Sequence, residues 1–486
     1  MATRRLKQPE QVTGLEIIDI TEDGRGVGKS DGRVLFIDKA IPGDVVDVEL
    51  FRRKKSLFEG RITRIVSESE FRRTPFCPHF GVCGGCKWQH LDYAGQLRYK
   101  QKQVSDALER LAGVSADLIS PIIPSPETTF YRNKLEFTFS NRRWLTDGEI
   151  VSRRNGETAS GLAEERSAED ENALGFHVPG RFDKIIHVDT CFLQSELSNR
   201  IRNAVAQYAR ENKLSFYDLR AHSGLLRNLI IRNTSTGEWM VIVVFAEDDP
   251  RSRTPLMDFI KTGFPEITSL LYIVNRKLND TIYDQEVITW SGRDHLVEQM
   301  EASGGAVQFK IGPKSFFQTN SAQAQRLYQV VSDLAAFEGG ENVYDLYTGA
   351  GTIANFVARQ VRSVTGIEYI QPAIADAREN SRLNGIDNTT FYAGDIKDVL
   401  TPEFVADNGQ PDVIITDPPR AGMHPGVVQR LVEIGPRKIV YVSCNPATQA
   451  RDLLVLKAHY AVKAIQPVDM FPHTTHVENV LLLERK

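Results

Sequence analysis

The stretch ENVYDLYTGAGTIA, residues 341–354, decides the fold of the C-terminal part of the chain. An apolar run ends at Asp345, a turn containing Gly349 and Gly351 follows, and a segment with helical character begins there. Glycines in such a turn let the backbone approach a bound ligand closely. Strand, glycine turn and helix in this order are typical of the first unit of a doubly wound α/β fold.

The alternation of strand and helix extends in both directions, from about Gly312 onward. The further apolar runs are SVTGIE, TTFYAGD, DVIITD and KIVYVS, and helical stretches such as AIADARENSRLNG separate them. We therefore expect a mostly parallel sheet that binds its ligand beyond the carboxyl ends of the strands. The glycine turn alone fits NAD as well as S-adenosylmethionine. Glu368, at the end of the next strand, suits the ribose hydroxyls of either cofactor.

Three later strand ends carry side chains that favour methyl transfer. Asp395 ends the run YAGD, and Asp417 ends another in TDPPR. A dehydrogenase needs no Asp-Pro-Pro at that place, whereas methyltransferases often have it beside the transferred methyl group. Cys444 follows a strand directly in VYVSCNP. A lone cysteine is more often a small buried hydrophobic residue, but this position favours a nucleophile.

The N-terminal part has a different pattern. Residues 12–66 alternate short apolar runs with the turn signals EDGRG, SDG and IPGD, which predicts a small antiparallel barrel. The net formal charge of −4 and the pI of about 6.3 argue mildly against nucleic acid as a partner. One basic segment is the exception, and it contains Arg52, Arg53, Lys54, Lys55, Arg61, Arg64, Arg72 and Arg73. A basic edge on a small barrel suits RNA, although a solvated surface is the simpler interpretation.

Four of the five cysteines form a second pattern. Three have the spacing Cys77-x5-Cys83-x2-Cys86, and Cys191 lies far downstream. Disulfides are rare in the cytoplasm. Four thiolates suit tetrahedral zinc and a 4Fe–4S cluster equally well, so the spacing alone leaves both open.

Composition indicates an ordinary globular protein with two or three domains. The chain has 486 residues, of which 41% are hydrophobic and 25% charged. No apolar run is long enough for a bilayer, and the N-terminus lacks the apolar stretch of a secretory signal. We therefore expect a cytoplasmic protein with no membrane association, and no obligate protein partner is inferred. Residues 93–112 predict an amphipathic helix, residues 152–173 a polar loop, and the segments around Ser235–Gly237 a hairpin.

Together these motifs resemble the bacterial RNA uracil-5-methyltransferases. Over nearly the full length, the chain is most similar to the type that carries a TRAM domain and an iron–sulfur cluster and modifies 23S ribosomal RNA. The resemblance implies a multidomain protein. We expect an OB-like TRAM barrel that binds RNA in residues 1–67, an α+β central domain with the iron–sulfur cysteines in residues 68–310, and a Rossmann-like class I methyltransferase domain in residues 311–486.

The resemblance also implies roles for individual residues. Cys77, Cys83, Cys86 and Cys191 would hold a structural 4Fe–4S cluster. Contacts to S-adenosyl-L-methionine fall to Gln318, Tyr347, Glu368, Asp395 and Asp417. Cys444 corresponds to the family's nucleophile and Glu478 to its base. Family members often have phenylalanine where Tyr347 stands and another residue type at Thr352. Phe316, close to Gln318, is either a base-stacking residue or part of the core.

The chemistry explains why a thiol and a base are needed. Uracil C5 is too weak a nucleophile to attack a methyl sulfonium, but thiolate addition to C6 gives C5 carbanion character. A base must then remove the C5 proton before the thiolate can leave, and the uracil must leave its stack to be reached. We therefore expect methylation of uridine C5 in RNA, most readily 23S rRNA, through a covalent Cys–C6 adduct. The alternatives are a tRNA uridine methyltransferase, an amine-directed methyltransferase and a non-catalytic RNA-binding protein.

Overall fold

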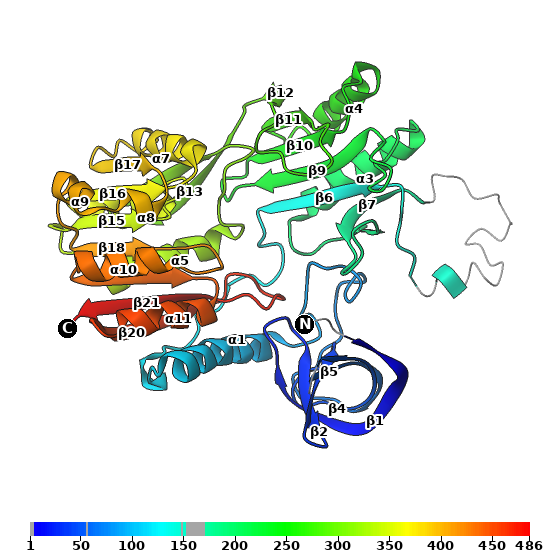
Figure 1. Cartoon of the computed structure of the whole chain (residues 1–486). Coiled ribbons are helices and arrows are strands. Elements are labelled where there is room, and N and C mark those ends of the chain that lie inside the picture. The colour runs from blue at the N-terminus through cyan, green and yellow to red at the C-terminus, as the bar shows by residue number, and fades with distance from the viewer. Residues whose placement is uncertain (1–3, 55–56, 147–148, 152–170) are drawn as a thin grey trace.

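The computed structural model describes residues 4–54, 57–146, 149–151 and 171–486, and it divides them into a barrel and two sheet-based units (Figure 1). Lys55 and most of the polar segment expected at 152–173 lie outside the described residues. None of the described helices is both long and apolar enough to span a bilayer.

The N-terminal unit is a small closed barrel, as expected, with the strand order β1-β2-β3-β5-β4. Its strands are β1 (Arg4–Ile20), β2 (Gly26–Ser30), β3 (Arg33–Asp38), β4 (Val45–Lys54) and β5 (Leu57–Ser67). The expectation of a wholly antiparallel barrel is wrong at one pair, because β3 and β5 run parallel. Inward-facing aliphatic side chains such as Leu35, Val48 and Leu50 are fully buried and fill its centre. A separate apolar cluster, which includes Trp88 and Tyr99, joins the barrel to the segment after the cysteines and to helix α1 (Tyr93–Ala107).

The central unit is a seven-stranded sheet in the order β12-β11-β10-β9-β6-β7-β8. Its strands are β6 (Lys134–Ser140), β7 (Ala173–His177), β8 (Ile185–His187), β9 (Leu226–Asn233), β10 (Trp239–Phe245), β11 (Ser269–Val274) and β12 (Val287–Gly292). Helices α3 (Glu196–Glu211) and α4 (Pro250–Gly263) pack on one face and share its core. The predicted hairpin is present, because β9 and β10 pair antiparallel from Asn233 and Trp239 outward.

The C-terminal unit has the predicted doubly wound architecture, with sheet order β17-β16-β15-β18-β19-β21-β20. The strands are β15 (Asn342–Leu346), β16 (Ser363–Glu368), β17 (Thr389–Ala393), β18 (Val413–Thr416), β19 (Lys438–Ser443), β20 (Tyr460–Val468) and β21 (Glu478–Arg485). β15 to β19 are parallel, whereas β21 runs antiparallel to both of its neighbours. Because helices cover both faces, the central parallel strands are almost continuously apolar and buried.

Helices cover both faces of this sheet (Figure 1). One core contains side chains of α5 (Ser321–Ala335), α6 (Thr352–Val357) and α7 (Gln371–Leu383). The other contains side chains of α8 (Ile396–Val399), α10 (Pro425–Ile434) and α11 (Pro446–Leu456), and α9 (Pro402–Asn408) packs at its edge. The sequence places α10 and α11 well, because His424 and Asn445 cap them and proline follows each cap.

Two elements expected in the central domain also contribute side chains to the cores of the C-terminal unit. The hairpin of β13 (Leu296–Ala302) and β14 (Gly305–Ile311) contributes Val307 and Phe309 to the first core of that unit. Helix α1 and the π-helical turn that extends it, Leu108–Ala112, contribute to the second core. Because of this packing we infer that the C-terminal unit begins before β13.

Candidate active site

The side chains predicted from the strand ends lie at one edge of the C-terminal sheet. Asp345 is the penultimate residue of β15, Glu368 ends β16, and Asp417 and Cys444 directly follow β18 and β19. β16, β15, β18 and β19 are consecutive neighbours in the sheet. The backbone N–H of Asp417 donates to the carbonyl of Leu346 at 3.3 Å, which ties two of these ends together.

The glycine turn after β15 adopts the conformation that its residues favour. Gly349 and Gly351 have φ of 56° and 71°, and Tyr347 adopts a φ of 64° without being glycine. A side chain on Gly351 would meet Ala377 of α7 at 2.9 Å. The turn also holds Glu368, whose carboxylate accepts from the N–H of Gly349 at 3.2 Å and of Ile370 at 2.9 Å.

Cys444 and Glu478 face each other across the ends of two antiparallel strands. The register pairs Ser443 of β19 with Asn479 of β21, so the next pair outward is Cys444 opposite Glu478. Glu478 is 5% exposed. Because β21 lies between β19 and β20, it brings the predicted base beside the predicted nucleophile.

Burial dominates the electrostatics of this edge. The pKa of the Cys444 thiol is raised to about 11, mainly by burial and then by the charges of Glu478 and Asp417, whereas Arg420 opposes the rise. Burial, followed by the charge of Asp417, raises the pKa of Glu478 well above its ordinary value. Burial also raises the pKa of Asp417 and of Asp345 to about 7 each. The site therefore has an excess of buried acidic groups and suits a cationic ligand.

The pocket around Cys444 is built by distant parts of the chain. Arg420, Asn445 and His476 line it from the C-terminal unit, Gln103 from α1, and Glu22 from the β1–β2 connection of the barrel. Arg420 could have been found from the sequence, since it directly follows Asp-Pro-Pro. Glu22 and Gln103 stand in no recognisable motif, and only packing brings them to the thiol.

The segment before α5 has one exposed and one buried phenylalanine. Phe317 is 6% exposed and belongs to the core, whereas Phe316 is 72% exposed. Phe316 lines a cavity of about 410 Å³ together with Arg132 and Lys134. The core interpretation of Phe316 is therefore wrong, and stacking on a base stays a prediction. The Gln318 carbonyl accepts from Asn133 Nδ2 at 2.9 Å.

Asp395 is occupied by local contacts. Its side chain caps α8 by accepting from the Lys397 N–H at 3.2 Å, and it pairs with Lys397 Nζ at 2.8 Å. The hydrogen bond from Lys397 is the largest cause of its lowered pKa.

The four cysteines outside the active site line one cavity. Cys77, Cys83 and Cys86 reach it from one loop, and Cys191 from the segment after β8. Burial raises the pKa of the Cys83 thiol to about 11 and of the Cys86 thiol to about 12. Across the described ranges, no three His, Cys, Asp or Glu side chains converge closely enough for a single metal ion. Zinc would need its sulfurs at about 2.3 Å, whereas a four-iron cluster fills a larger space.

The surroundings of Cys191 suit a negatively charged group. Asn199 fixes its backbone, accepting from the Cys191 N–H at 2.8 Å and donating to its carbonyl at 3.1 Å. Arg202 is fully buried, donates to Asn199 at 2.9 Å, and interacts electrostatically with Cys191. A buried cation beside Cys191 compensates charge when that thiol is ionised as a metal ligand.

The basic segment of the barrel is more nearly neutral than its sequence indicated. Arg61 pairs with Glu49 at 2.7 Å and Arg64 with Asp47 at 2.8 Å, both across the β4–β5 ladder. Arg72 pairs with the buried carboxylate of Asp44. These acidic partners precede the basic segment in the sequence, so the charges of the segment alone do not include them. Arg52 stays 54% exposed and only approaches Glu59, at 3.6 Å.

Comparison with known proteins gives one consistent result. The family model of the tRNA (uracil-5-)-methyltransferases matches residues 283–486. Proteins named uncharacterized RNA methyltransferases from Bacteroides thetaiotaomicron and Porphyromonas gingivalis are 54% and 51% identical, over 95% and 97% of this chain and 99% of each relative. The crystal structure of a Pyrococcus abyssi tRNA (uracil-54, C5)-methyltransferase with S-adenosyl-L-homocysteine is similar at 30% identity and a TM-score of 0.72, covering 97% of this chain and all of that one.

Proposed function

Because this chain belongs to the RNA uracil-5-methyltransferase family, whose members use S-adenosyl-L-methionine, we propose that Cys444 and Glu478 carry out the reaction on one uridine of a structured RNA. The observation that carries this assignment is the β19–β21 register, which opposes the two side chains at the carboxyl edge of the sheet. Binding alone needs neither a thiol nor a buried carboxyl group at that edge.

Cys444 would attack C6 of the uracil as a thiolate. The pKa of about 11 shows that the thiol needs help to ionise in the free protein. Arg420 and the N-terminus of α11, which begins directly after the Asn445 cap, are the groups that favour the anion. A bond then forms between Sγ and C6, and the electron pair of the C5–C6 double bond moves toward C5 and the carbonyl oxygen at C4.

Glu478 would take the C5 proton once C5 has been methylated. The electrons of that C–H bond restore the C5–C6 double bond, and the Sγ–C6 bond breaks. A carboxyl group with a raised pKa is a stronger base than an exposed one, which suits this step. The group must be ionised when it acts as a base.

The methyl donor would be held by Gln318, Tyr347, Glu368 and Asp417. Asp395, whose side chain is paired with Lys397, is a further candidate. When bound, it supplies an electrophilic methyl group on a sulfonium. The excess of acidic groups at this edge supports binding of a cation. Glu368 is also held rigidly by two backbone N–H groups, which suits the recognition of ribose hydroxyls.

For the RNA, we propose ribosomal RNA, with tRNA as the second candidate. The cysteine pattern supports the ribosomal type. The barrel no longer helps to decide, because the tRNA-directed protein of P. abyssi aligns with 97% of this chain and therefore covers the barrel too. Mapping 5-methyluridine in ribosomal RNA and tRNA from a strain that lacks the gene identifies the missing site directly.

We also propose that the four cysteines hold a structural 4Fe–4S cluster. Four thiols from two distant segments line the same cavity, and the buried Arg202 interacts electrostatically with Cys191. All four ligand positions would be filled by the chain, which suits a structural group and leaves no iron open to substrate.

The catalytic assignment predicts that two variants fail differently. Cys444→Ala should form no covalent RNA adduct and no product. Glu478→Gln should allow attack and methylation but stall at elimination, so methylated RNA stays joined to Cys444. A slow band on a denaturing gel, absent from the double variant, detects it. Their effects should be non-additive.

The exposed Glu433→Gln on α10, which affects only surface contacts with Arg430 and Gln429 of the same helix, is the matched control and should turn over normally. Near-normal methylation by Cys444→Ala would make the thiol structural and would overturn the assignment of the nucleophile.

A further inference from the structure

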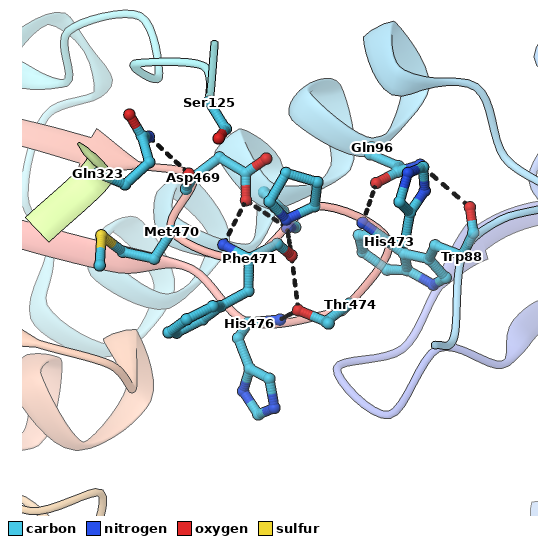
Figure 2. Close-up of polar contacts among 12 residues, drawn as sticks. Trp88, Gln96, Ser125, Gln323, Asp469, Met470, Phe471, His473, Thr474 and His476 are labelled. Atoms are coloured by element: carbon cyan, nitrogen blue, oxygen red, sulfur yellow. Dashed lines mark hydrogen bonds and ion pairs between the residues drawn. The ribbon is translucent and has the colours of Figure 1, made fainter. Parts of the chain in front are cut away.

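The connection between β20 and β21, residues 469–477, is hydrogen-bonded to several other parts of the chain (Figure 2). It ends directly before Glu478, and Thr475, His476 and Val477 line the pocket of Cys444. We name residues 469–477 the hub loop. Its course decides where the predicted base stands relative to the predicted nucleophile.

Each of the first five carbonyls of the hub loop accepts a hydrogen bond from a different donor residue. The pairs are Asp469 with Gln323 Nε2 (2.7 Å), Met470 with Asn320 Nδ2 (2.9 Å), Phe471 with Lys100 Nζ (3.0 Å), Pro472 with the Tyr131 hydroxyl (3.0 Å), and His473 with the Lys87 and Trp88 N–H groups (2.8 and 3.1 Å). The donors lie at the start of α5, on α1, before β6 and just after Cys86. Such a loop has little freedom of its own.

Helix α1 supplies the charged contact. Lys100 Nζ lies 2.6 Å from Asp469 Oδ1, and both side chains are fully buried. The Tyr93 hydroxyl donates to the second oxygen of Asp469 at 2.8 Å. A buried ion pair adds little to stability over apolar residues of the same shape, but it fixes geometry.

Gln96 on the same helix joins the hub loop to the cysteine segment. Its Oε1 accepts from the His473 N–H at 2.7 Å, and its Nε2 donates to the Trp88 carbonyl at 3.1 Å (Figure 2). The same Nε2 donates to the Leu91 carbonyl at 2.8 Å. His473 adopts a φ of 63°, a conformation that needs outside support in a residue other than glycine. Lys87, which donates to the His473 carbonyl, is the residue after Cys86.

From these contacts we propose that Lys100, Asp469 and Gln96 are positioning residues for Glu478, and that through the hub loop the cysteine segment contributes to the proton-abstraction step. This inference rests on the proposed roles of Cys444 and Glu478. None of the three residues lines the pocket of Cys444. They act by keeping the loop, and hence the start of β21, in register with the end of β19.

The double variant Lys100→Met, Asp469→Asn tests the proposal, because it removes the ion pair without leaving a buried charge alone. A displacement of the base by an ångström is enough to slow a step about 100-fold. We expect kcat to fall at least about 10-fold, the Kd of S-adenosyl-L-methionine to change less than about twofold, and methylated RNA to accumulate on Cys444. Lys102→Met, the same change on the same helix at a half-exposed pair with Asp19, is the control.

The outcomes separate the hypotheses. Release of product at the wild-type rate would overturn the positioning role. If adduct formation and product release instead fall by the same factor, equal to the loss of folded protein, the three residues have only a structural role. The positioning role would then again be overturned. Gln96→Leu keeps the ion pair and should accumulate the adduct in the same way. This variant tests the proposal if the double variant does not fold. If wild-type protein forms no adduct with RNA containing 5-fluorouridine, whose C5 fluorine no base can remove, the proposed function itself fails.

Discussion

At the scale of residues, the C-terminal sheet is distinguished by buried carboxyl groups at the carboxyl ends of its parallel strands. Asp345 is 1% exposed, its Oδ2 accepts from the Thr348 hydroxyl at 2.5 Å, and its Oδ1 has no partner in the described part of the chain. Burial raises its pKa from the ordinary value of 3.8 to about 7. When it is ionised, a carboxyl group buried in this way lowers the stability of the free protein. The same group favours the binding of a cationic ligand.

This placement predicts how stability depends on pH. Between about pH 4 and pH 7 the folded protein holds a proton on Asp345 that the unfolded chain has lost, so the free energy of unfolding falls as pH rises through that window. Asp345→Asn removes this dependence. At pH 8 the variant should be more stable than wild type by on the order of 2–4 kcal/mol, since one pKa unit is about 1.4 kcal/mol. Urea unfolding measures the difference.

The difference between the two proteins should shrink as pH falls toward 4, where wild-type Asp345 is largely neutral in the folded state and becomes so in the unfolded chain. Asp407→Asn, on the exposed face of α9, should leave the curve unchanged. A variant less stable than wild type at pH 8 would mean that the Asp345 carboxylate is stabilised in its ionised form.

At the scale of elements, the barrel shows why charge must be counted across strands. The β4–β5 ladder places acidic residues of β4 beside arginines of β5 that lie more than ten positions away in sequence. Exposed pairs of this kind are weak, and their arginines can exchange a carboxylate for a phosphate. At the end of β4, the Arg52 side chain stays 54% exposed.

Neutralising the basic residues 52–55 should weaken the binding of RNA. Changing Arg52, Arg53, Lys54 and Lys55 to alanine should lower affinity and flatten its salt dependence, by about 0.7 in the log–log slope for each phosphate that is no longer neutralised. The Kd of the methyl donor should not change. Filter binding of RNA between low and physiological salt gives the slope.

The double variant Arg251→Ala, Lys261→Ala on α4, at the opposite end of the molecule in Figure 1, is the control and should bind RNA normally. An unaltered slope in the barrel variant would exclude this segment from the interface.

At the scale of the whole molecule, the cysteine cavity joins segments that are far apart in sequence. Cys86 and Cys191 are separated by 105 positions (191 − 86) and approach the same cavity. Closing a loop of that length restricts the unfolded chain, and metal binding adds its own free energy to folding. The segment after Cys86 hydrogen-bonds to the hub loop, and the hub loop lines the pocket of Cys444. The cysteine cavity and the active site are therefore joined through this loop.

Protein purified without oxygen should therefore contain about four irons and four sulfides per chain, the stoichiometry of a 4Fe–4S cluster. Cys191→Ala should lose most of the iron and unfold at a temperature several degrees lower, because the long loop is open. Metal and sulfide analysis with thermal unfolding checks both results. Zinc without sulfide in the wild-type protein would contradict the cluster.

The sequence by itself determined what depends on local pattern. Alternating apolar runs and turn signals predicted the barrel, and the alternation around ENVYDLYTGAGTIA predicted the doubly wound sheet. Asp417 and Cys444 were found because each directly follows a buried strand, and strand ends of a parallel sheet share one edge. Periodicity and turn chemistry report on neighbours along the chain, so they are sufficient for these features.

Only the tertiary structure decided which distant elements meet. Insertion of β21 between β19 and β20 places Glu478 opposite Cys444, and nothing in FPHTTHVENV specifies that pairing. The same holds for Glu22 and Gln103 at the thiol pocket and for Lys100 at Asp469, 369 positions away. Such contacts are selected by the packing free energy of the whole chain, which no short segment contains.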